Sequence, residues 1–183
     1  DFKTLANQYR NELLDNVLPF WLEHSQDLEF GGYFTCLDRK GGVFDTDKFI
    51  WLQGREVWMF SMLYNKVEKR QEWLDCAVLG GEFLKKYGHN GDYNWYFSLN
   101  RSGRPLVEPY NIFSYTFATM AFGQLSLATG SQEYADIAKK TFEIILSKVD
   151  NPKGKWNKLH PDTRNLKNFA LPMILCNLAL EIE

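Results

Sequence analysis

Arg55 is the side chain whose surroundings in this sequence point most directly to chemistry. It lies within residues 46–64, a stretch without proline that is apolar at nearly every position from Phe49 onward. Such a stretch predicts a helix inside the protein, because a helix that is apolar on all sides is normally buried. On a period of 3.6 residues, Arg55 shares one face of this helix with bulky apolar side chains. These are Trp51, Trp58, Met59 and Met62.

Two interpretations of Arg55 follow from this placement. Arginine is almost never fully buried alone, because removing an unpaired guanidinium from water is very unfavourable. Arg55 therefore either forms an ion pair with a nearby acid or lines a wet pocket walled by aromatic rings. The acids nearest in the sequence are Asp45, Asp47 and Glu56. We favour the pocket, since tryptophan, methionine and arginine on one inward face suit a polar ligand. Asp45 or Glu56 could still orient the guanidinium from behind.

Further side chains are candidates for the same pocket. Trp51, one helical turn before Arg55, could stack on a ligand or fill the core. Tyr33 lies on a short strand and Ser114 on a second apolar helix, where its hydroxyl could instead bond to its own helical turn. Asn168 opens the last apolar helix, so ligand binding competes there with capping of the helix.

The histidines and cysteines show no pattern of a catalytic or metal site. His24, His89 and His160 all fall in turns or connections with polar neighbours, which predicts surface positions. The three cysteines are odd in number and have no ligand spacing, so we expect neither disulfides nor a bound metal. Free cysteines fit a reducing compartment, and we therefore expect a cytoplasmic protein.

Composition excludes several classes of partner. The chain has 183 residues, of which 45% are hydrophobic and 16% aromatic, enough for one sizeable core. A formal net charge of −2 gives no reason to expect a nucleic acid or an anionic membrane as partner. No apolar run approaches the length of a membrane span, and the first residues lack the apolar core of a signal peptide.

The pocket residues must be positioned by a series of helices with short strands between them. Helical periodicity predicts amphipathic helices at 3–22, 71–87 and 132–149, and apolar helices at 46–64, 111–128 and 166–182. Glycine turns and alternating side chains predict short strands within 31–42 and 95–103, and residues 151–154 form a turn.

These elements repeat along the chain. Leu37-x-Arg39-x-Gly41 recurs as Leu99-x-Arg101-x-Gly103 at a shift of 62 residues, and other matches fall at shifts of 61 and 63. Each unit holds an amphipathic outer helix, a short hairpin and an apolar inner helix. Units that cannot bury their own apolar face must stack on their neighbours. We therefore expect an all-α protein, an α/α toroid of helical hairpins, with three repeats of about 62 residues in this chain.

Long stretches in order along the chain resemble the N-acylglucosamine 2-epimerase family. The stretches are Phe20-Trp21-Leu22-Glu23-His24-Ser25, Gly31-Gly32-Tyr33-Phe34-Thr35-Cys36-Leu37-Asp38-Arg39, Trp51-Leu52-Gln53-Gly54-Arg55-Glu56-Val57-Trp58, Pro109-Tyr110-Asn111-Ile112-Phe113-Ser114, Asn151-Pro152-Lys153-Gly154 and Ala170-Leu171-Pro172-Met173-Ile174-Leu175. The later ones look closest to bacterial members. The resemblance implies an (α/α)6 barrel of about twice this length, and residues 1–183 would form one domain, its N-terminal half.

The resemblance also implies a reaction. Members of the family interconvert N-acyl-D-glucosamine and N-acyl-D-mannosamine, an isomerisation that removes the C2 proton of the open-chain sugar and returns one on the other face. Arg55 matches the inner-helix arginine of the family and would stabilise charge at O1. The two acid/base histidines lie in the C-terminal half of family members, so this chain alone is expected to be inactive. Pro172 and Met173 resemble the acylhexosamine branch rather than the disaccharide epimerases, which carry a histidine near this position.

Two alternatives stay open from the sequence alone. One is a non-catalytic sugar-binding or scaffold protein, and the other is a glycoside hydrolase, which would need paired carboxylates in the cavity. The expected partner is a small-molecule aminosugar, and the resemblance is compatible with a homodimer. The chemistry requires no cofactor. ATP activates members of the family, yet the sequence has no phosphate-binding Gly-x-x-x-x-Gly-Lys loop, so its site is unknown.

Overall fold

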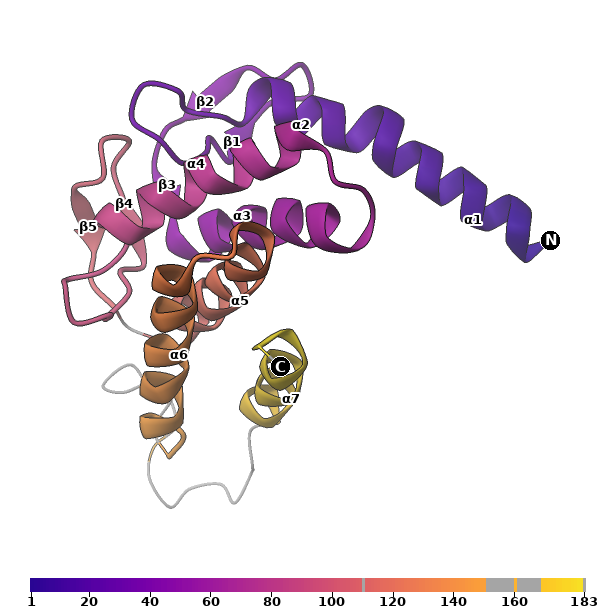
Figure 1. Cartoon of the computed structure of the whole chain (residues 1–183). Coiled ribbons are helices and arrows are strands. Elements are labelled where there is room, and N and C mark those ends of the chain that lie inside the picture. Colours follow the sequence, from indigo (N-terminus) through magenta and orange to yellow (C-terminus); the bar gives the residue numbers. More distant parts are fainter. Residues whose placement is uncertain (110, 151–159, 161–168, 183) are drawn as a thin grey trace.

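Two apolar helices, α3 (Ile50–Lys66) and α5 (Phe113–Thr129), lie side by side at the centre of the computed structural model (Figure 1). The structure describes residues 1–109, 111–150, 160 and 169–182. Along α3 the residues Ile50, Val57 and Phe60 are fully buried, and most of α5 is buried as well. The helix α5 ends at Gly130, whose positive φ of 72° favours glycine and closes the helix.

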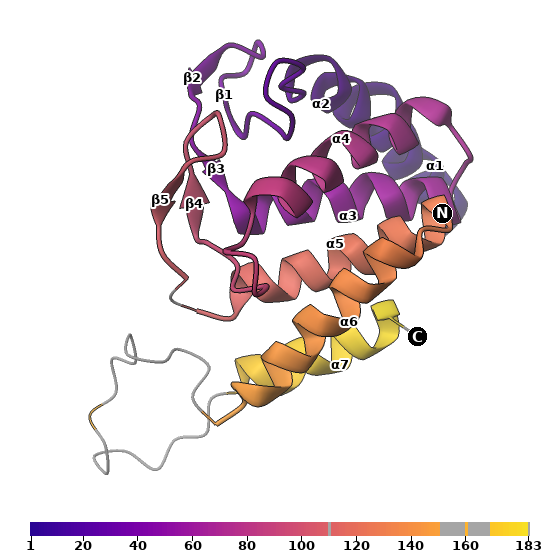
Figure 2. The same ribbon diagram turned by 60° about the vertical axis from the view of Figure 1, so that its left-hand side comes forward.

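Two amphipathic helices cover the outside of this central pair. The helix α4 (Gln71–Tyr87) packs on α3, and α6 (Gln132–Ser147) packs on α5. Each outer helix follows its inner helix after a short connection, so the two form helical hairpins (Figure 2). The observed bounds agree closely with the predicted helices at 46–64, 71–87, 111–128 and 132–149.

Short antiparallel strands join the hairpins at one end of the inner helices (Figure 2). The strands β1 (Cys36–Leu37) and β2 (Val43–Asp45) pair with each other. A second sheet has the order β3-β4-β5, formed by β3 (Lys48–Phe49), β4 (Ser98–Leu99) and β5 (Pro105–Val107). The strand β3 leads directly into α3 but pairs with β4, so the second sheet ties one repeat to the next.

A buried ionic cluster reinforces this tie. The Nζ of Lys48 donates to Asp27 Oδ2 at 2.9 Å and to the carbonyl oxygens of Gly31 and Arg101 at 2.5 and 2.9 Å. Arg101 donates to both carboxylate oxygens of Asp27, at 2.9 and 3.0 Å. Burial alone would raise the pKa of Asp27, but the hydrogen bonds from Arg101 and Lys48 hold it below its ordinary value. The cluster joins three segments far apart in the sequence.

The N-terminal helical segment differs from its prediction. A single amphipathic helix was expected at 3–22, whereas the structure has α1 (Phe2–Asn11), a π-helical turn η1 (Glu12–Val17) and α2 (Leu18–His24). The segment extends away from the body of the molecule (Figure 1). The apolar side chains that predicted a buried face are exposed as far as residue 17, and burial begins at Leu18.

The last helix, α7 (Ala170–Ile182), packs on α5 as a third inner element (Figures 1 and 2). Pro172 lies in its first turn, where a missing backbone N–H costs nothing. The inner helices α3, α5 and α7 with the outer helices α4 and α6 confirm the expected α/α toroid architecture. That residues 1–183 form half of a six-hairpin barrel stays a prediction, and the predicted turn at 151–154 lies outside the described residues. None of the helices in the described ranges is long and apolar enough to cross a membrane.

Candidate functional site

A cavity of about 1050 Å³ opens between the three inner helices. Its walls are mostly aromatic and aliphatic, with a few polar side chains among them. The lining residues are Trp51, Arg55, Trp58 and Met59 from α3, Phe97 and Asn111 from the segment between α4 and α5, Phe113, Ser114, Thr116, Phe117 and Met120 from α5, and Met173, Ile174 and Asn177 from α7. Such a concave, largely apolar site with few polar groups is typical of small-molecule binding.

Arg55 lies on the wall of this cavity, as the sequence predicts. Its guanidinium carbon is 4.5 Å from the ring centroid of Phe117 and 5.4 Å from that of Trp51. Both rings lie in cation–π range, which holds the guanidinium without neutralising it. No carboxylate among the described residues forms an ion pair with Arg55. Arg55 is exposed and lines the cavity, so its N–H donors are open to a ligand there.

The close approach of α3 and α5 explains this placement. A Cβ atom built at Gly54 would be 2.9 Å from the backbone carbonyl of Phe117, so only glycine allows the two helices to meet here. Arg55 directly follows Gly54, and the contact between the helices therefore brings the Phe117 ring against its guanidinium. Trp51 lies one turn earlier on the same face, and its ring centroid is 6.4 Å from that of Phe117.

The two acids that could orient Arg55, Asp45 and Glu56, form no ion pair with it in the described structure. Glu56 is buried and does not line the cavity, and its carboxyl is 2.5 Å from Ser25 Oγ. Burial raises the pKa of Glu56 to about 8, so the group holds its proton at neutral pH. The carboxylate of Asp45 is exposed and accepts a hydrogen bond from the backbone N–H of Asp47 at 3.0 Å.

The other predicted site residues divide into three groups. Trp51 and Ser114 line the cavity. Tyr33 does not, which corrects the expectation from its strand position: it is fully buried in the core, and its hydroxyl donates to the carbonyl of Cys76 at 2.7 Å. The side chain of Gln53 accepts a hydrogen bond from the backbone N–H of Tyr33 and donates one to its carbonyl oxygen. These two bonds keep the phenol in the core. Asn168 lies outside the described residues.

Several polar lining residues were not predicted from the sequence. Asn111 accepts a hydrogen bond from the backbone N–H of Phe113 at 2.9 Å, and Thr116 donates to the carbonyl of the same residue at 2.9 Å. The Asn111 side chain therefore caps a backbone N–H at the start of α5, whereas the Thr116 hydroxyl bonds back to its own helical turn. Asn177 differs, because its only hydrogen-bond contact within the described structure is with the sulfur of Met120, at 3.9 Å. The spacing of Met173, Ile174 and Asn177 along one helical face could have indicated this wall.

The wall formed by α7 is held in place by Glu181. One of its carboxylate oxygens accepts hydrogen bonds from Trp58 Nε1 and from Gln124 Nε2, both at 2.9 Å. Gln124 is buried and its side chain also accepts from Asn65. Glu181 therefore joins α7 to both α3 and α5 at a fixed register. This contact connects residues 123 positions apart in the sequence, and local spacing could not predict it.

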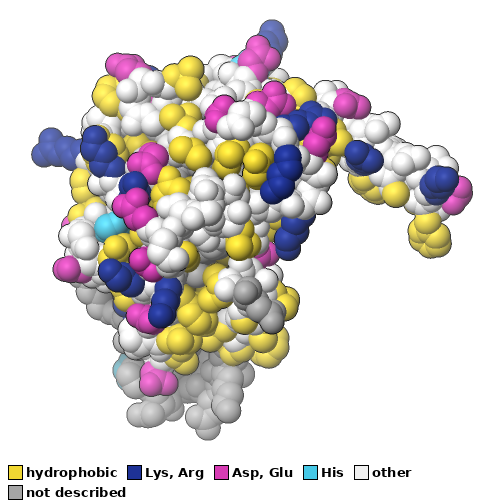
Figure 3. Space-filling model, viewed as in Figure 1, with side chains coloured by type: hydrophobic (Ala, Val, Ile, Leu, Met, Phe, Trp, Pro, Cys, Tyr) yellow, Lys and Arg dark blue, Asp and Glu magenta, His cyan; other side chains and the backbone are white. Residues whose placement is uncertain are grey.

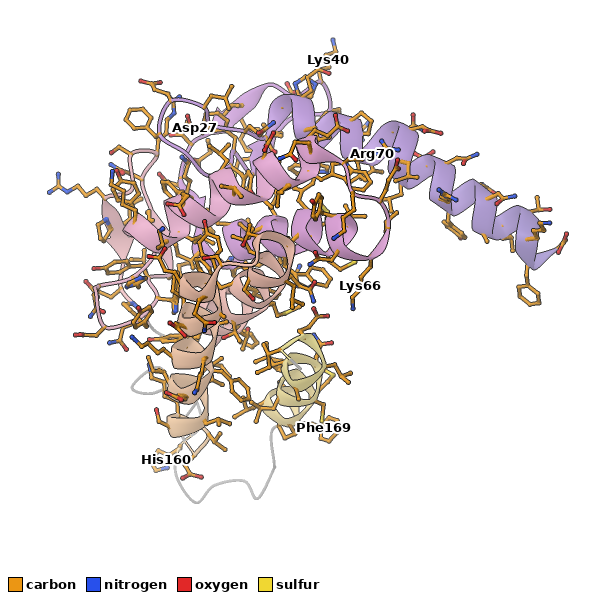
Figure 4. The ribbon with its side chains drawn as sticks, in the orientation of Figure 1. Asp27, Lys40, Lys66, Arg70, His160 and Phe169 are labelled. Carbon is orange, nitrogen blue, oxygen red and sulfur yellow. The ribbon has the colours of Figure 1, made fainter. Side chains whose placement is uncertain are left out.

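None of the described residues that line the cavity is a histidine, an aspartate or a glutamate. His24 contacts Phe20, and His89 stacks on Tyr93 with ring centroids 4.7 Å apart. Figure 4 shows His160 beyond the end of α6. Within the described ranges there is no group of three or more His, Cys, Asp and Glu side chains that could hold a metal ion.

Comparison with known proteins gives relatives that are named as sugar 2-epimerases. The sequence matches the profile of the N-acylglucosamine 2-epimerase (GlcNAc 2-epimerase) family over residues 32–182. It is 41% identical to N-acylglucosamine 2-epimerase of Bos taurus over 174 residues, which are 92% of this chain and 41% of that protein. It is 40% identical to the protein of that name from Homo sapiens, with the same shares of the two chains covered. The chain thus spans about two fifths of the length of these curated relatives.

Solved structures share the fold. Cellobiose 2-epimerase from Bacillus thermoamylovorans superposes with a TM-score of 0.72 at 29% identity, covering 79% of this chain and 37% of that one. A D-mannose isomerase superposes with a TM-score of 0.75 at 18% identity, covering 92% of this chain and 44% of that one. At that identity the second likeness concerns the fold alone.

Proposed function

Because the chain belongs to the N-acylglucosamine 2-epimerase family, we propose that it is part of an isomerase that interconverts N-acyl-D-glucosamine and N-acyl-D-mannosamine. The relatives named for this reaction are 40–41% identical, whereas those named cellobiose 2-epimerase are 27–29% identical. The observation that carries the proposal is Arg55, a guanidinium without a carboxylate partner in the described structure that faces an aromatic cavity.

The geometry around Arg55 suits an enolate intermediate. Loss of the C2 proton from the open-chain sugar leaves an electron pair that is shared with O1, and a proton returned to the other face of C2 inverts that carbon. A fixed cation at O1 stabilises this charge more in the transition state than in the ground state. Arg55 is exposed on the cavity wall, and the rings of Trp51 and Phe117 hold its guanidinium by cation–π contacts, which positions the positive charge for a ligand.

We assign the proton transfers to residues beyond those described here. A general base must lie within hydrogen-bond reach of the C2 proton, and an acid must reach the other face. The described lining residues include no side chain of ordinary acid/base type. Since the chain covers about two fifths of its relatives, we propose that it supplies the arginine and the cavity walls, while the acid and the base come from the remainder of the protein. Activation by ATP stays a prediction.

The two alternative functions make different demands on the same cavity. A glycoside hydrolase needs two carboxylates on either side of the bond that breaks, and the described lining supplies none. A protein that only binds sugars would use the cavity without exchanging the C2 proton. Proton exchange at C2 therefore separates the enzyme from the binding protein.

The role of Arg55 is tested by kinetics of the longer protein that contains this sequence. We expect Arg55→Ala to lower kcat by about 10²–10³-fold with a small change in KM, as is typical when one group that stabilises developing charge is removed. The matched control is Arg104→Ala, at an exposed arginine in the turn between β4 and β5. An unchanged kcat with a raised KM would contradict the proposal and assign Arg55 to ground-state binding.

A further inference from the structure

We propose that Asn177 binds the amide of the N-acyl group and thereby selects acylated aminosugars over sugars that carry a hydroxyl at C2. This inference rests on the function proposed above and names the part of the substrate that α7 recognises.

The first observation is the chemical contrast along the wall that α7 contributes. Met173 and Ile174 are apolar, and Asn177, one turn later, brings a carboxamide into the same cavity. Its contact with Met120 Sδ at 3.9 Å is weak, because a thioether sulfur is a poor acceptor. Asn177 is exposed, and no other hydrogen bond to its carboxamide is formed by the described residues, so its carbonyl oxygen and one of its two N–H donors are available to a ligand.

The second observation is that this carboxamide is held on a rigid element. Glu181 lies one helical turn after Asn177 and is fixed by the indole N–H of Trp58 and the amide of Gln124. Trp58 itself lines the cavity on α3, one turn after Arg55. The same hydrogen bonds therefore set the position of Asn177 relative to the helix that carries the arginine. A side chain on a fixed helix discriminates between ligands better than one on a loop.

The third observation is the match between a carboxamide and an N-acyl group. A secondary amide offers one N–H donor and one carbonyl acceptor, and the side chain of asparagine offers the complementary acceptor and donors. The sulfur and methyl groups of Met120 and Met173 would receive the acyl methyl in an apolar environment. A hydroxyl at C2 can satisfy only some of the hydrogen-bonding groups of Asn177. It also leaves the side chains of Met120 and Met173 uncovered.

The test compares two ligands and three proteins. The chain and its variants Asn177→Leu and Cys176→Leu are titrated with N-acetylglucosamine and with glucose, and binding is followed by saturation-transfer NMR. Leucine is similar in size to asparagine but cannot form hydrogen bonds. Cys176 is the exposed neighbour on α7 that does not line the cavity, so its variant controls for an added leucine. Thermal unfolding of each variant checks that the fold is retained.

We expect the unmodified chain to prefer N-acetylglucosamine by roughly tenfold or more, since a site built to hydrogen-bond a substrate group rejects analogues that lack it. Asn177→Leu should reduce this preference to near one by weakening N-acetylglucosamine alone, and Cys176→Leu should keep it. An unchanged preference in Asn177→Leu, or an equal loss of both sugars, would overturn the inference while leaving the sugar site in place. If neither sugar binds to the unmodified chain, both the inference and a sugar site in this cavity are rejected.

Discussion

At the scale of single residues, two neighbouring ionisable groups on α3 lie in different environments. Arg55 is exposed on the cavity wall, beside two aromatic rings. Glu56, the next residue, faces the core and is neutral at physiological pH because burial raises its pKa to about 8. Ser25 has two acceptors within reach, the carbonyl of Trp21 at 2.6 Å and the carboxyl of Glu56 at 2.5 Å, but only one proton. A protonated Glu56 resolves this conflict by donating to Ser25 Oγ.

This arrangement predicts the pH dependence of stability. The native state holds a proton on Glu56 up to about pH 8, whereas the ordinary pKa is 4.5. The native state thus binds more protons than the unfolded chain between these values, so the free energy of unfolding falls as the pH rises through this window. The shift corresponds to a loss on the order of 5 kcal/mol. Glu56→Gln should remove this component and be more stable than the unmodified protein above pH 8.

The measurement is urea unfolding at a series of pH values. Glu143→Gln, at an exposed position on α6, is the matched control and should keep the pH dependence of the unmodified protein. If Glu56→Gln retains the same fall in the free energy of unfolding between pH 5 and 8, the buried neutral carboxyl is not its cause.

At the scale of elements, the arginine site depends on how closely α3 approaches α5. Gly54 has no space for a side chain, because a Cβ atom would meet the carbonyl of Phe117 at 2.9 Å, and backbone cannot move aside as a side chain can. The glycine is therefore needed for packing rather than for a special backbone angle. Its position beside Arg55 couples the packing of the helices to the geometry of the site.

Gly54→Ala is the variant that tests this coupling. We expect it to separate the helices and to destabilise the protein by about 1–3 kcal/mol, the usual range for overpacking. In Gly123→Ala, the control on α5, the new Cβ atom would meet the side chain of Ile182 at 3.3 Å, which can shift. That variant should be neutral or slightly stabilising, since alanine favours helix over glycine. Equal effects of the two variants on the thermal unfolding midpoint would contradict the argument.

Much of this element-level description could be predicted from the sequence. The helix α4 has the bounds that periodicity gives, and α3 and α5 begin within a few residues of theirs. The strand β3 was assigned to the start of the helix at 46–64, because its pairing with a strand of the next repeat is not visible in the local sequence. Tyr33 was assigned to the cavity because the sequence does not show which side of its strand faces the core. Helical spacing places Asn177 on one face with Met173 and Ile174, but the direction in which this face points depends on the long-range hydrogen bonds of Glu181, which the sequence does not show.

At the scale of the whole molecule, apolar side chains are exposed at both ends of the arc of helices. Phe2, Leu5 and Tyr9 are exposed on α1, and Met173 and Leu180 on α7. Figure 3 shows apolar side chains gathered over α7 and along one side of the projecting N-terminal helix. Figure 4 shows Phe169 at the start of α7, where it is 76% exposed. Exposed apolar surface of this kind usually meets a partner surface.

We therefore expect the isolated chain to associate with itself. Sedimentation velocity should show an average mass that rises with protein concentration. Leu180→Glu should reduce this association with an unchanged circular dichroism spectrum, because Leu180 is 73% exposed and lies outside the cavity lining. The control Lys139→Glu places the same charge on α6 at a residue that is already polar. A monomer at every concentration would show that these surfaces do not drive association.

We propose that the described residues of this chain supply an arginine and a cavity for C2 chemistry, and that the groups that move the proton lie outside them. The direct measurement is NMR of the C2 proton of N-acetylglucosamine incubated with the purified chain in deuterium oxide. We predict that the sugar binds, that its C2 proton does not exchange with solvent, and that no N-acetylmannosamine forms. Exchange at a rate that Arg55→Ala abolishes and Arg104→Ala leaves unchanged would contradict the claim, because it would show a complete catalytic site within this chain.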